Sequence, residues 1–423
     1  MGLTAGDLGS VDLTDPATYV ERLPHDYFAL LRAECPVYWH SDTPVAQGFW
    51  AVTKHEDIIT ISRDIANYSS AVGFVTLEDL EPDAMALRRS MIETDPPEHT
   101  RLRRLVSPLF TPKAIEKYRQ SAERVANQLL DHALESESFD WATDVCEPLP
   151  IRVFVEIMGI EERDADFLAR TANQLVTVDD PELAPPPEAY ARARARGFEP
   201  RLLPFRSPAA LDLFDFGRQL AAERRSEPRG DLLTRLVEAE WDGDRLTDSE
   251  FVNFFQLLIF AGNETTRTSL QQGMLAFVEN PGQLEALRGS PELIPNAVEE
   301  VLRWATPIYY FRRTAVNDVE LRGIPIRSGD KVVMYYISGN YDEKVFDRPR
   351  EFNISRELNP NLTFGGGGPH FCLGAWLARM QVAVMLEAFI ARGVRLVPAS
   401  EPRRLRSSFT NGLKSFRVRA VRV

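Results

Sequence analysis

TFGGGGPHFCLG, residues 363–374, is the stretch around which the rest of the chain is interpreted. Its four consecutive glycines allow the backbone to take positive φ angles and to approach a neighbouring group closely. Cys372 stands just before a run of apolar residues at helical spacing, and a cysteine at a helix N-terminus faces unpaired N–H groups that stabilise its thiolate. The stretch therefore predicts a thiolate ligand for a metal, and haem iron is the metal that suits a single buried thiolate.

Other glycine-rich or cysteine-containing sites fit this stretch less well. A phosphate-binding loop would continue with Gly-Lys-Ser/Thr, whereas Pro369 and His370 follow the glycines, and a dinucleotide-binding turn would need a further glycine near His370 or Phe371. Zinc would need paired cysteines, and Cys35 and Cys146 lie far away in the sequence. A nucleophilic cysteine beside His370 and a merely flexible loop remain as alternatives, but the haem–thiolate interpretation is favoured.

The stretch resembles the haem-binding signature of the cytochrome P450 monooxygenases, Phe-Gly-x-Gly-x-His-x-Cys-x-Gly. Five residues stand at matching positions: Phe364, Gly365, His370, Cys372 and Gly374. The resemblance extends over most of the chain and implies a mainly α fold with small β-sheets (α+β), in which a triangular prism of helices with one long central helix surrounds haem b. It implies that Cys372 is the axial ligand of the iron, that Phe364 and Gly365 lie at the cofactor, and that dioxygen is a co-substrate.

The composition fits one large globular unit. Of the 423 residues, 44% are hydrophobic, which is ample for a core, and no linker or repeat divides the chain, so we expect a single domain over residues 1–423. The net charge of −13 argues against nucleic acid as a partner. Three cysteines without framework spacing fit a reducing cytoplasm. Without a signal-peptide pattern or an apolar run of about 18 residues, we expect a soluble, cytoplasmic, monomeric protein with no membrane span.

Hydrophobic spacing predicts the helices and strands around the site. We expect a strand hairpin from residues 37–40 and 49–53, strands at 319–321 and 331–334 around the turn at Gly329-Asp330, and strands at 394–397 and 416–421. These contribute to β-rich parts at about 35–70, 315–335 and 394–423, and the remainder is helical. Helices are expected at 27–34, 55–61, 112–134 and 146–159. The prolines of 179–210 predict a long irregular loop, which the resemblance implies is a lid over the substrate channel.

A basic pair follows two prolines that favour a helix start. His99 and Arg103 are four residues apart and share one helix face, where they can bind a carboxylate through charge-assisted hydrogen bonds. From spacing alone, a solvated basic helix face is the alternative. The resemblance implies that His99 and Arg103 bind the haem propionates, and that Arg313 and His370 supply two further cationic groups.

A long buried helix is predicted from a capping box at Thr247 and Glu250 to about Glu279. At ~1.5 Å per residue it would span roughly 50 Å, about the width of the molecule. Its first half is apolar nearly all round, and then residues 261–267 read AGNETTR, with a glycine and β-branched residues that disfavour a helix. Such a departure indicates either a site or a kink used for packing.

The AGNETTR segment resembles the oxygen-activating motif of the same family. The resemblance implies that Ala261 lies beside the haem, that Thr265 hydrogen-bonds the bound dioxygen and that Glu264 relays protons to it. Glu300 and Arg303 are three residues apart, which alone would indicate a weak surface ion pair. The resemblance implies that they form a buried structural pair instead.

The resemblance also implies a substrate pocket, formed by Val72, Phe74, Leu258, Ala261, Ile308, Tyr309, Tyr310, Thr410 and Leu413. Because most of these side chains are apolar, we expect a lipophilic substrate such as a terpenoid, sterol, branched lipid or other natural product. The expected reaction is insertion of one oxygen atom by hydroxylation or epoxidation. A peroxide-driven haem peroxygenase, which would lack the Glu264–Thr265 pair, and a non-catalytic haem-binding protein are the alternatives.

No flavin or nicotinamide motif is visible in the chain. Electrons should therefore come from a separate ferredoxin and its ferredoxin reductase. We expect the ferredoxin to dock on the face behind Cys372, near Arg101, Arg104 and Arg379.

Overall fold

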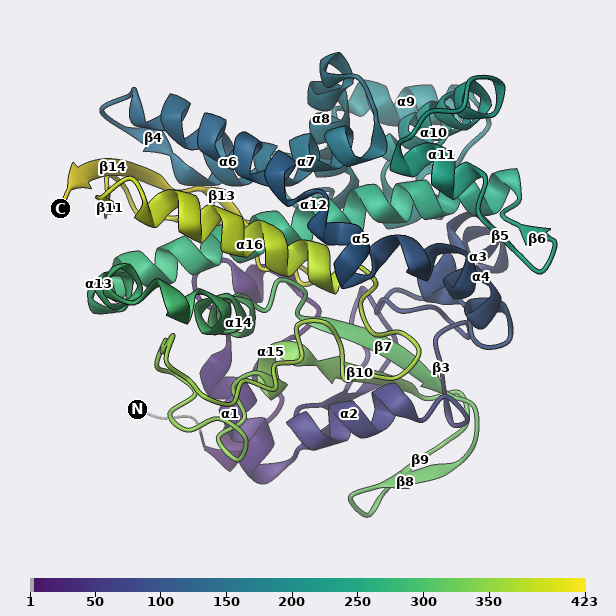
Figure 1. Ribbon diagram of the computed structural model, residues 1–423. Helices are drawn as coiled ribbons and strands as arrows, with labels where there is room; N and C mark the ends of the chain where they lie inside the picture. Colours follow the sequence, from purple (N-terminus) through teal and green to yellow (C-terminus); the bar gives the residue numbers. More distant parts are fainter. Residues whose placement is uncertain (1–3) are drawn as a thin grey trace.

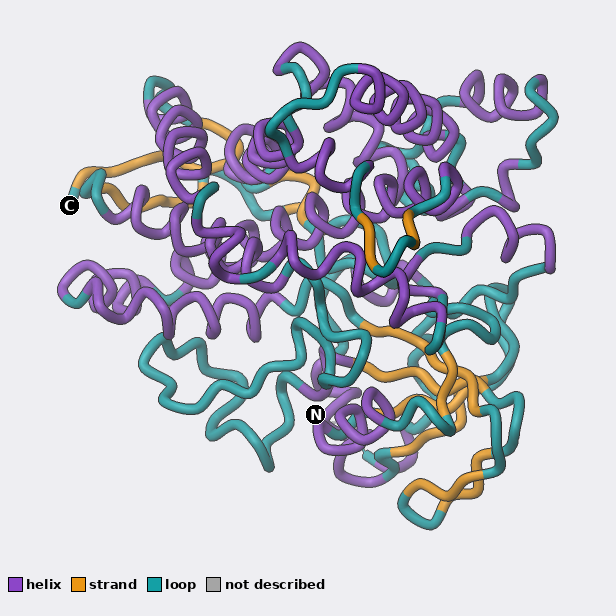
Figure 2. The backbone as a smooth tube through the Cα atoms, turned by 45° about the vertical axis from the view of Figure 1, so that its right-hand side comes forward, coloured by secondary structure: helices purple, strands orange, loops and turns teal. Residues whose placement is uncertain are grey.

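Helices dominate the computed structural model, which describes residues 4–423. The sequence-based prediction of a mainly helical fold with small sheets is confirmed (Figure 2). The helices are α1 (His25–Glu34), α2 (His55–Arg63), α3 (Pro82–Arg88), α4 (Glu98–Val106), α5 (Pro112–Glu116), α6 (Arg119–Leu134), α7 (Pro148–Met158), α8 (Ala165–Val176), α9 (Pro187–Ala195), α10 (Ala209–Ser226), α11 (Leu232–Val237), α12 (Asp248–Glu279), α13 (Pro281–Gly289), α14 (Ile294–Ala305), α15 (Tyr336–Gly339) and α16 (Ala375–Ile390).

The strands form one five-stranded sheet and several smaller ones. The larger sheet has the order β1-β2-β10-β7-β3, and a three-stranded sheet has the order β11-β14-β4. The pairs β5–β6, β8–β9 and β12–β13 are separate two-stranded sheets. The strands are β1 (Val37–His40), β2 (Phe49–Val52), β3 (Tyr68–Ser69), β4 (Phe139–Asp140), β5 (Glu240–Trp241), β6 (Asp244–Arg245), β7 (Tyr310–Ala315), β8 (Val319–Leu321), β9 (Ile324–Ile326), β10 (Lys331–Tyr335), β11 (Val394–Pro398), β12 (Arg403–Arg404), β13 (Leu413–Ser415) and β14 (Arg417–Arg422).

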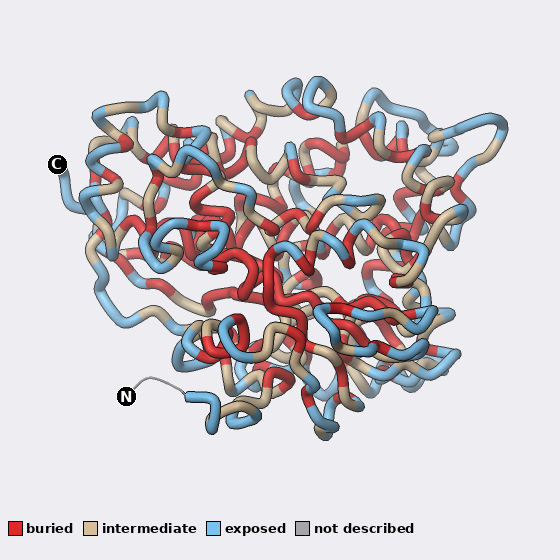
Figure 3. The backbone as a smooth tube through the Cα atoms, turned by 90° about the horizontal axis from the view of Figure 1, so that it is seen from below, coloured by how far each residue is buried: buried red, intermediate tan, exposed pale blue. Residues whose placement is uncertain are grey.

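Helix α12 runs through the middle of the molecule, as predicted (Figure 1). Thr247 accepts a hydrogen bond from the backbone of Glu250, and the Glu250 carboxylate accepts one from the Thr247 backbone, so the expected capping box starts the helix. The helix contacts α7, α8, α10, α14 and α16, which places its length inside the helical core. Seen from below, the buried segments likewise gather at the centre of the molecule (Figure 3). Such a helix is held by packing on every side.

The five-stranded sheet lies below this helical layer, with α1 and α2 beneath it in the view of Figure 1. Strands β1 and β2 form the predicted antiparallel hairpin. The predicted strands near residues 394–397 and 416–421 are present as β11 and β14, and the structure shows that they pair with each other. A cluster of aromatic and aliphatic side chains joins α1 to the sheet. None of the helices in residues 4–423 combines the length and the apolar character that crossing a membrane requires.

One predicted helix and one predicted loop need correction. The segment after Pro112 is not one helix, because the backbone N–H of Tyr118 donates to Ile115 in a tight turn that ends α5 before α6 begins. The proline-rich residues 179–210 are not an irregular loop throughout. Pro187 stands at the first position of α9, where its missing N–H costs nothing, and short 3₁₀ turns follow at Pro200–Leu202 and Pro204–Arg206.

The pairing around the Gly329-Asp330 turn also differs from the prediction. Strand β8 pairs with β9, because Arg322 and Gly323 both have positive φ and form a two-residue hairpin turn. Strand β10 pairs instead with β2 and with β7, a strand that the sequence analysis does not predict. The unpredicted strand β7 carries Arg313 in the middle of the larger sheet.

Candidate active site

The glycine-rich loop before α16 is folded tightly around Cys372. The backbone N–H of Cys372 donates to the Phe364 carbonyl at 3.0 Å, which closes the loop. Gly365, Gly367 and Gly368 all have φ angles between +76° and +91°, so the positive φ expected of these glycines is observed. A Cβ atom on Gly366 would lie 2.6 Å from the Ser62 hydroxyl, so a side chain there would collide with α2. The glycines therefore let the loop lie directly on α2.

Cys372 lies three residues before α16 and keeps some solvent exposure although protein surrounds it closely. The backbone N–H of Gly374 and the charges of Arg103 and Arg379 lower the pKa of its thiol, but burial is the larger effect and raises that pKa. The thiolate expected at this helix N-terminus stays a prediction for the metal-bound protein, in which coordination favours the deprotonated sulfur.

Four basic side chains meet beside this loop. His99 and Arg103 come from α4, Arg313 from β7 and His370 from the cysteine loop, and the two imidazole rings lie 4.1 Å apart. Burial and then the charge of Arg103 lower the pKa of His99 to about 4, and burial with the charge of Arg313 lowers that of His370 to about 2. None of the four forms an ion pair with a carboxylate within residues 4–423. The nearby Asp95 carboxylate bonds to Ser69 and to the Ser70 backbone, so the cluster keeps donors for an anionic ligand.

The middle of α12 has one accessible face. Ala261 is exposed and Gly262 and Thr265 are half-buried, whereas Asn263 and Glu264 beside them are buried. The Thr265 hydroxyl donates to the carbonyl of Ala261 at 2.6 Å, four residues earlier on the same helix. Ala261 and Thr265 therefore lie on an accessible face of α12, next to positions of the helix that are packed against the rest of the protein.

Glu264 points away from this accessible face. Its carboxylate contacts the Arg267 guanidinium, and the Thr268 hydroxyl donates to it at 3.4 Å. Burial raises the pKa of Glu264, while Arg267 lowers it in part. Because positions 264 and 265 are about 100° apart around the helix, the carboxylate has to change its rotamer to reach the side of Thr265.

The residues present fit a haem group. Cys372 offers one sulfur ligand, Arg103 and Arg313 offer cationic donors without carboxylate partners, and the neutral imidazoles of His99 and His370 offer N–H donors, as two propionates require. No group of three or more His, Cys, Asp or Glu that could hold a metal occurs in the described part of the chain, so a macrocycle would have to supply the other ligands.

The predicted pocket residues do not all lie together. Leu258 is half-buried one turn before Ala261, and Ile308 forms a bridge with Thr410, which brings the turn at 408–413 beside the start of β7. Leu413, in β13, lies beside a later part of α12. Its backbone N–H donates to the Gln271 side chain, and its carbonyl accepts from the same side chain. Val72 is half exposed, and Phe74 is buried with a φ of +64°.

Tyr309 requires a correction, whereas Tyr310 stays a predicted pocket residue. The Tyr309 ring stacks on Tyr19 at 4.6 Å, and its hydroxyl donates to the Asn411 amide, so it belongs to the cluster between α1 and the sheet and not to the space beside Ala261. Tyr310 also lies in that cluster, although its ring contacts Phe409 at 5.4 Å. Neighbouring positions in extended backbone point to opposite sides, so the whole run 308–310 could not line one pocket.

An aromatic group that the sequence analysis does not list stands over this region. Phe260, next to Ala261, contacts Phe205 at 4.5 Å between ring centroids and Phe409 at 6.4 Å. Phe205 has a φ of +54° in the 3₁₀ turn of residues 204–206. Phe409 is next to Thr410, a predicted pocket residue, so it could have been predicted as well, but no local signal in the sequence points to Phe205.

Glu300 and Arg303 form a bidentate ion pair with both N–O distances at 2.8 Å, and neither side chain is exposed. Arg303 also donates to the carbonyls of Asn340 and Pro349, and Glu300 accepts from the Asn353 backbone. The pair thus ties α14 to the irregular chain that leads into the cysteine loop.

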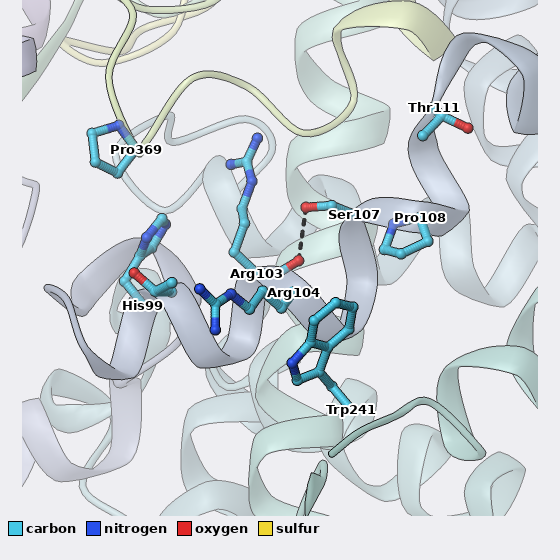
Figure 4. Close-up of a pocket in the computed structure, with 9 residues that line it drawn as sticks. His99, Arg103, Arg104, Ser107, Pro108, Thr111, Trp241 and Pro369 are labelled. Carbon is cyan, nitrogen blue, oxygen red and sulfur yellow. Dashed lines mark hydrogen bonds between the residues drawn. The ribbon is translucent and has the colours of Figure 1, made fainter.

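A cleft of about 580 Å³ opens beside His99 and Arg103 of α4 (Figure 4). Its charged lining is entirely basic and consists of His99, Arg103 and Arg104, while Trp241 from β5 and Pro369 from the cysteine loop form opposite walls. Arg104 lies 5.9 Å from the Trp241 ring. Of the other two arginines expected at a docking face, Arg101 pairs with Asp244 and Glu250, and Arg379 pairs with Glu299.

Comparison with known proteins identifies the family. The family model "Cytochrome P450" matches residues 212–402. The chain is 38% identical to a steroid C26-monooxygenase of Rhodococcus jostii, over 96% of this chain and 84% of the relative. It is 36% identical to a methyl-branched lipid omega-hydroxylase of Mycobacterium bovis, over 92% of this chain and 90% of the relative. The solved structure of Mycobacterium marinum cytochrome P450 CYP268A2 in complex with pseudoionone superposes with a TM-score of 0.86 at 36% identity, covering 97% of this chain and 98% of that one. The chain belongs to the cytochrome P450 family and is a P450 monooxygenase.

Proposed function

We propose that this monooxygenase hydroxylates a sterol, a terpenoid or a methyl-branched lipid. The observation that carries the proposal is the apolar surround of Ala261, where Phe260, Phe205, Phe409 and Leu258 offer aromatic and aliphatic surface. Such a lining favours a lipophilic substrate. Two relatives whose names give a steroid and a methyl-branched lipid as substrates support the same class.

In this proposal Cys372 ligates the iron of haem b, and the basic cluster binds the propionates. Phe364, Gly365 and Ala261 lie against the cofactor. When bound, the haem with its thiolate ligand supplies the activation of dioxygen. The protein contributes the thiolate, the cations that neutralise the propionates and an apolar surround that excludes water.

Proton delivery is assigned to the central helix. Thr265 presents its hydroxyl on the accessible face, where it would hydrogen-bond the dioxygen co-substrate. Glu264 would supply the proton after turning from Arg267, and its raised pKa favours the protonated carboxyl that this role needs. The acid and the alcohol are adjacent on the helix but act from different faces.

Electrons would come from a ferredoxin that is reduced by its own reductase, with the chain acting as a single-domain monomer. The basic cleft offers a docking surface for an acidic protein. Arg103 and Arg104 both lack a carboxylate partner in the described chain, and Arg104 is the one that is not assigned to the propionates. We expect Arg104→Glu to slow reduction by ferredoxin at low ionic strength. Arg163→Glu, a reversal at an arginine whose side chain is 77% exposed and outside the cleft, should leave the rate unchanged. Equal rates in both variants would reject this docking surface.

The first experiment is the absorption spectrum of the reduced protein with carbon monoxide. A strongly red-shifted Soret band that is lost in Cys372→Ser would establish thiolate ligation. A screen for spin-state shifts should then give binding with sterols, terpenoids or methyl-branched lipids, and electron-driven turnover should give a hydroxylated product. Binding confined to polar molecules would overturn the substrate class, and a protein that takes up no haem would overturn the whole proposal.

A further inference from the structure

A chain of polar contacts leads from Glu264 to the surface. On α12, the Arg267 guanidinium contacts the Glu264 carboxylate and also donates to the Asn173 carbonyl oxygen of α8 at 2.5 Å. The same guanidinium lies 3.5 Å from the carboxylate of Glu147, the residue before α7. Asn173 in turn donates to Glu147 at 2.5 Å. Helix α12, helix α8 and the residue before α7 therefore meet at one arginine.

The exposure of these groups increases outward. The Glu264 side chain is 3% exposed and Arg267 is 7% exposed, whereas Glu147 is 29% exposed. Arg267 thus stands between a buried acid and an acid that is in contact with solvent. The Arg267 guanidinium alone is enough to pair with Glu264. The outer acid, Glu147, is therefore not needed to neutralise that pair.

Arg267 can exchange partners without losing its counter-charge. Its two terminal nitrogens already face different oxygens, and its Nε has no hydrogen-bond partner in the described structure. The side-chain oxygen of Asn263, one turn earlier on α12, is also buried without a partner. Unpaired buried groups beside an ion pair mark a network with more than one arrangement of hydrogen bonds.

The other ionisable group in contact with this network is neutral. Burial raises the pKa of the Cys146 thiol well above its usual value, so it does not compete for Arg267. Asp140 faces Cys146 and not the guanidinium. Glu264 and Glu147 are therefore the two carboxylates between which the Arg267 charge is shared.

We propose that Arg267 is a positioning residue that holds Glu264 away from the reaction site, and that Glu147, with Asn173, draws Arg267 outward so that Glu264 can turn toward Thr265. The inference rests on the proposed role of Glu264 as the proton donor. After Glu264 gives its proton it becomes a carboxylate and pairs again with Arg267. It regains a proton from a hydronium ion that enters from the solvent beside Glu147 while Arg267 is drawn outward, and Arg267 itself stays protonated throughout.

The test is Glu147→Gln, which keeps the size and a hydrogen-bonding oxygen but removes the outer charge. The Glu147 charge raises the pKa of Glu264, so the variant should lower the pH at which Glu264 ionises. Infrared spectroscopy of the resting, haem-loaded enzyme would follow the carboxyl C=O band that disappears in Glu264→Gln. In turnover, the product formed per electron pair should fall about threefold to tenfold, and the solvent isotope effect should rise.

The matched control is Glu161→Gln, which removes the same charge from a side chain that is 54% exposed and pairs with Arg163 and not with Arg267. It should change neither the band nor the yield. An unchanged Glu264 titration in Glu147→Gln, or no band that depends on Glu264, would overturn the inference. Because the infrared measurement needs no substrate, a band that shifts in an enzyme that hydroxylates no lipid would reject the proposed substrate class and leave the inference standing.

Discussion

Two Glu-x-x-Arg pairs lie on buried helices of this protein, and their surroundings differ. Glu300 and Arg303 on α14 are unexposed and bidentate, and backbone groups satisfy both partners further. Glu264 and Arg267 on α12 have the same spacing, but Arg267 has one unpaired nitrogen and a link to the half-exposed Glu147. Glu300 also accepts from Arg356 at 3.2 Å and from the Asn359 side chain, so the first pair is bonded on several sides. The unpaired Nε in the second pair leaves room for another arrangement of hydrogen bonds, as the proposed proton delivery by Glu264 requires.

Identical spacing therefore does not decide between a structural and a functional ion pair. What decides is how completely the surrounding backbone satisfies the pair. The irregular chain after α15 encloses Arg303, whereas side chains of α7 and α8, which can move, are the outer partners of Arg267. A buried charge that is fully bonded is costly to disturb.

The largest expected effect separates the two pairs by stability. Arg303→Met removes the bidentate partner of Glu300 in a site without solvent. The carboxylate keeps Arg356 at 3.2 Å and the Asn359 side chain, so we expect a loss of about 3 kcal/mol in the free energy of unfolding, at the lower end for a broken buried pair. Arg267→Met should cost about 1–2 kcal/mol, since burial has already raised the pKa of Glu264, which can take up a proton instead. Denaturant unfolding of both variants measures the difference. Equal costs would contradict the distinction between the pairs.

A structural feature can be predicted from the sequence when the residues that determine it lie within the same segment. The limits of α12 follow from its capping box and its long apolar run, and the conformation of the cysteine loop follows from its glycines. Each of these signals lies within the segment that it describes. The resemblance to a known signature then adds the cofactor and the mainly helical fold.

The errors concern contacts between distant segments. The direction of Tyr309 depends on Tyr19, and the pairing of β10 depends on β7 and β2, none of which a local pattern specifies. The spacing of Glu264 and Arg267 is visible in the sequence, but Asn173, which binds Arg267, lies 94 residues away from it. Periodicity indicates that a helix is buried and not what it is buried against.

The two ion pairs should also differ in how the free energy of unfolding depends on pH. The pKa of Glu264 is raised in the folded state, so the unfolded chain loses this proton first and stability falls as pH rises above the ordinary value of 4.5. Glu264→Gln cannot ionise, so its unfolding free energy should fall less than that of the wild type between pH 4.5 and neutral pH. Glu300→Gln should instead be destabilised at neutral pH, because it loses half of a satisfied pair. Similar pH profiles for the two variants would contradict this.

The basic cluster beside Cys372 extends the comparison to charges that have no partner. The pKa of His99 falls from 6.5 to about 4 on folding, so in the absence of haem the unfolded chain takes up the proton first and stability is lost as pH drops from 6.5 toward 4. We expect His99→Gln to recover on the order of 1 kcal/mol at the acid end, after allowance for solvent screening. Bound propionates should raise the pKa of His99 and remove the effect, which thermal unfolding with and without haem would show.

Thr265→Ala should have the smallest effect on stability and a large one on the reaction. The Thr265 hydroxyl bonds only to the Ala261 carbonyl of its own helix, and alanine favours a helix at least as well, so the unfolding free energy should stay within about 0.5 kcal/mol of the wild type. The product formed per electron pair should nevertheless fall by a factor of about 10 or more, because the hydroxyl is the proposed contact to dioxygen. Oxygen consumption and product yield measured together give this ratio. Full coupling in Thr265→Ala would remove the hydroxyl from the mechanism and leave Glu264 without the partner toward which it is proposed to turn.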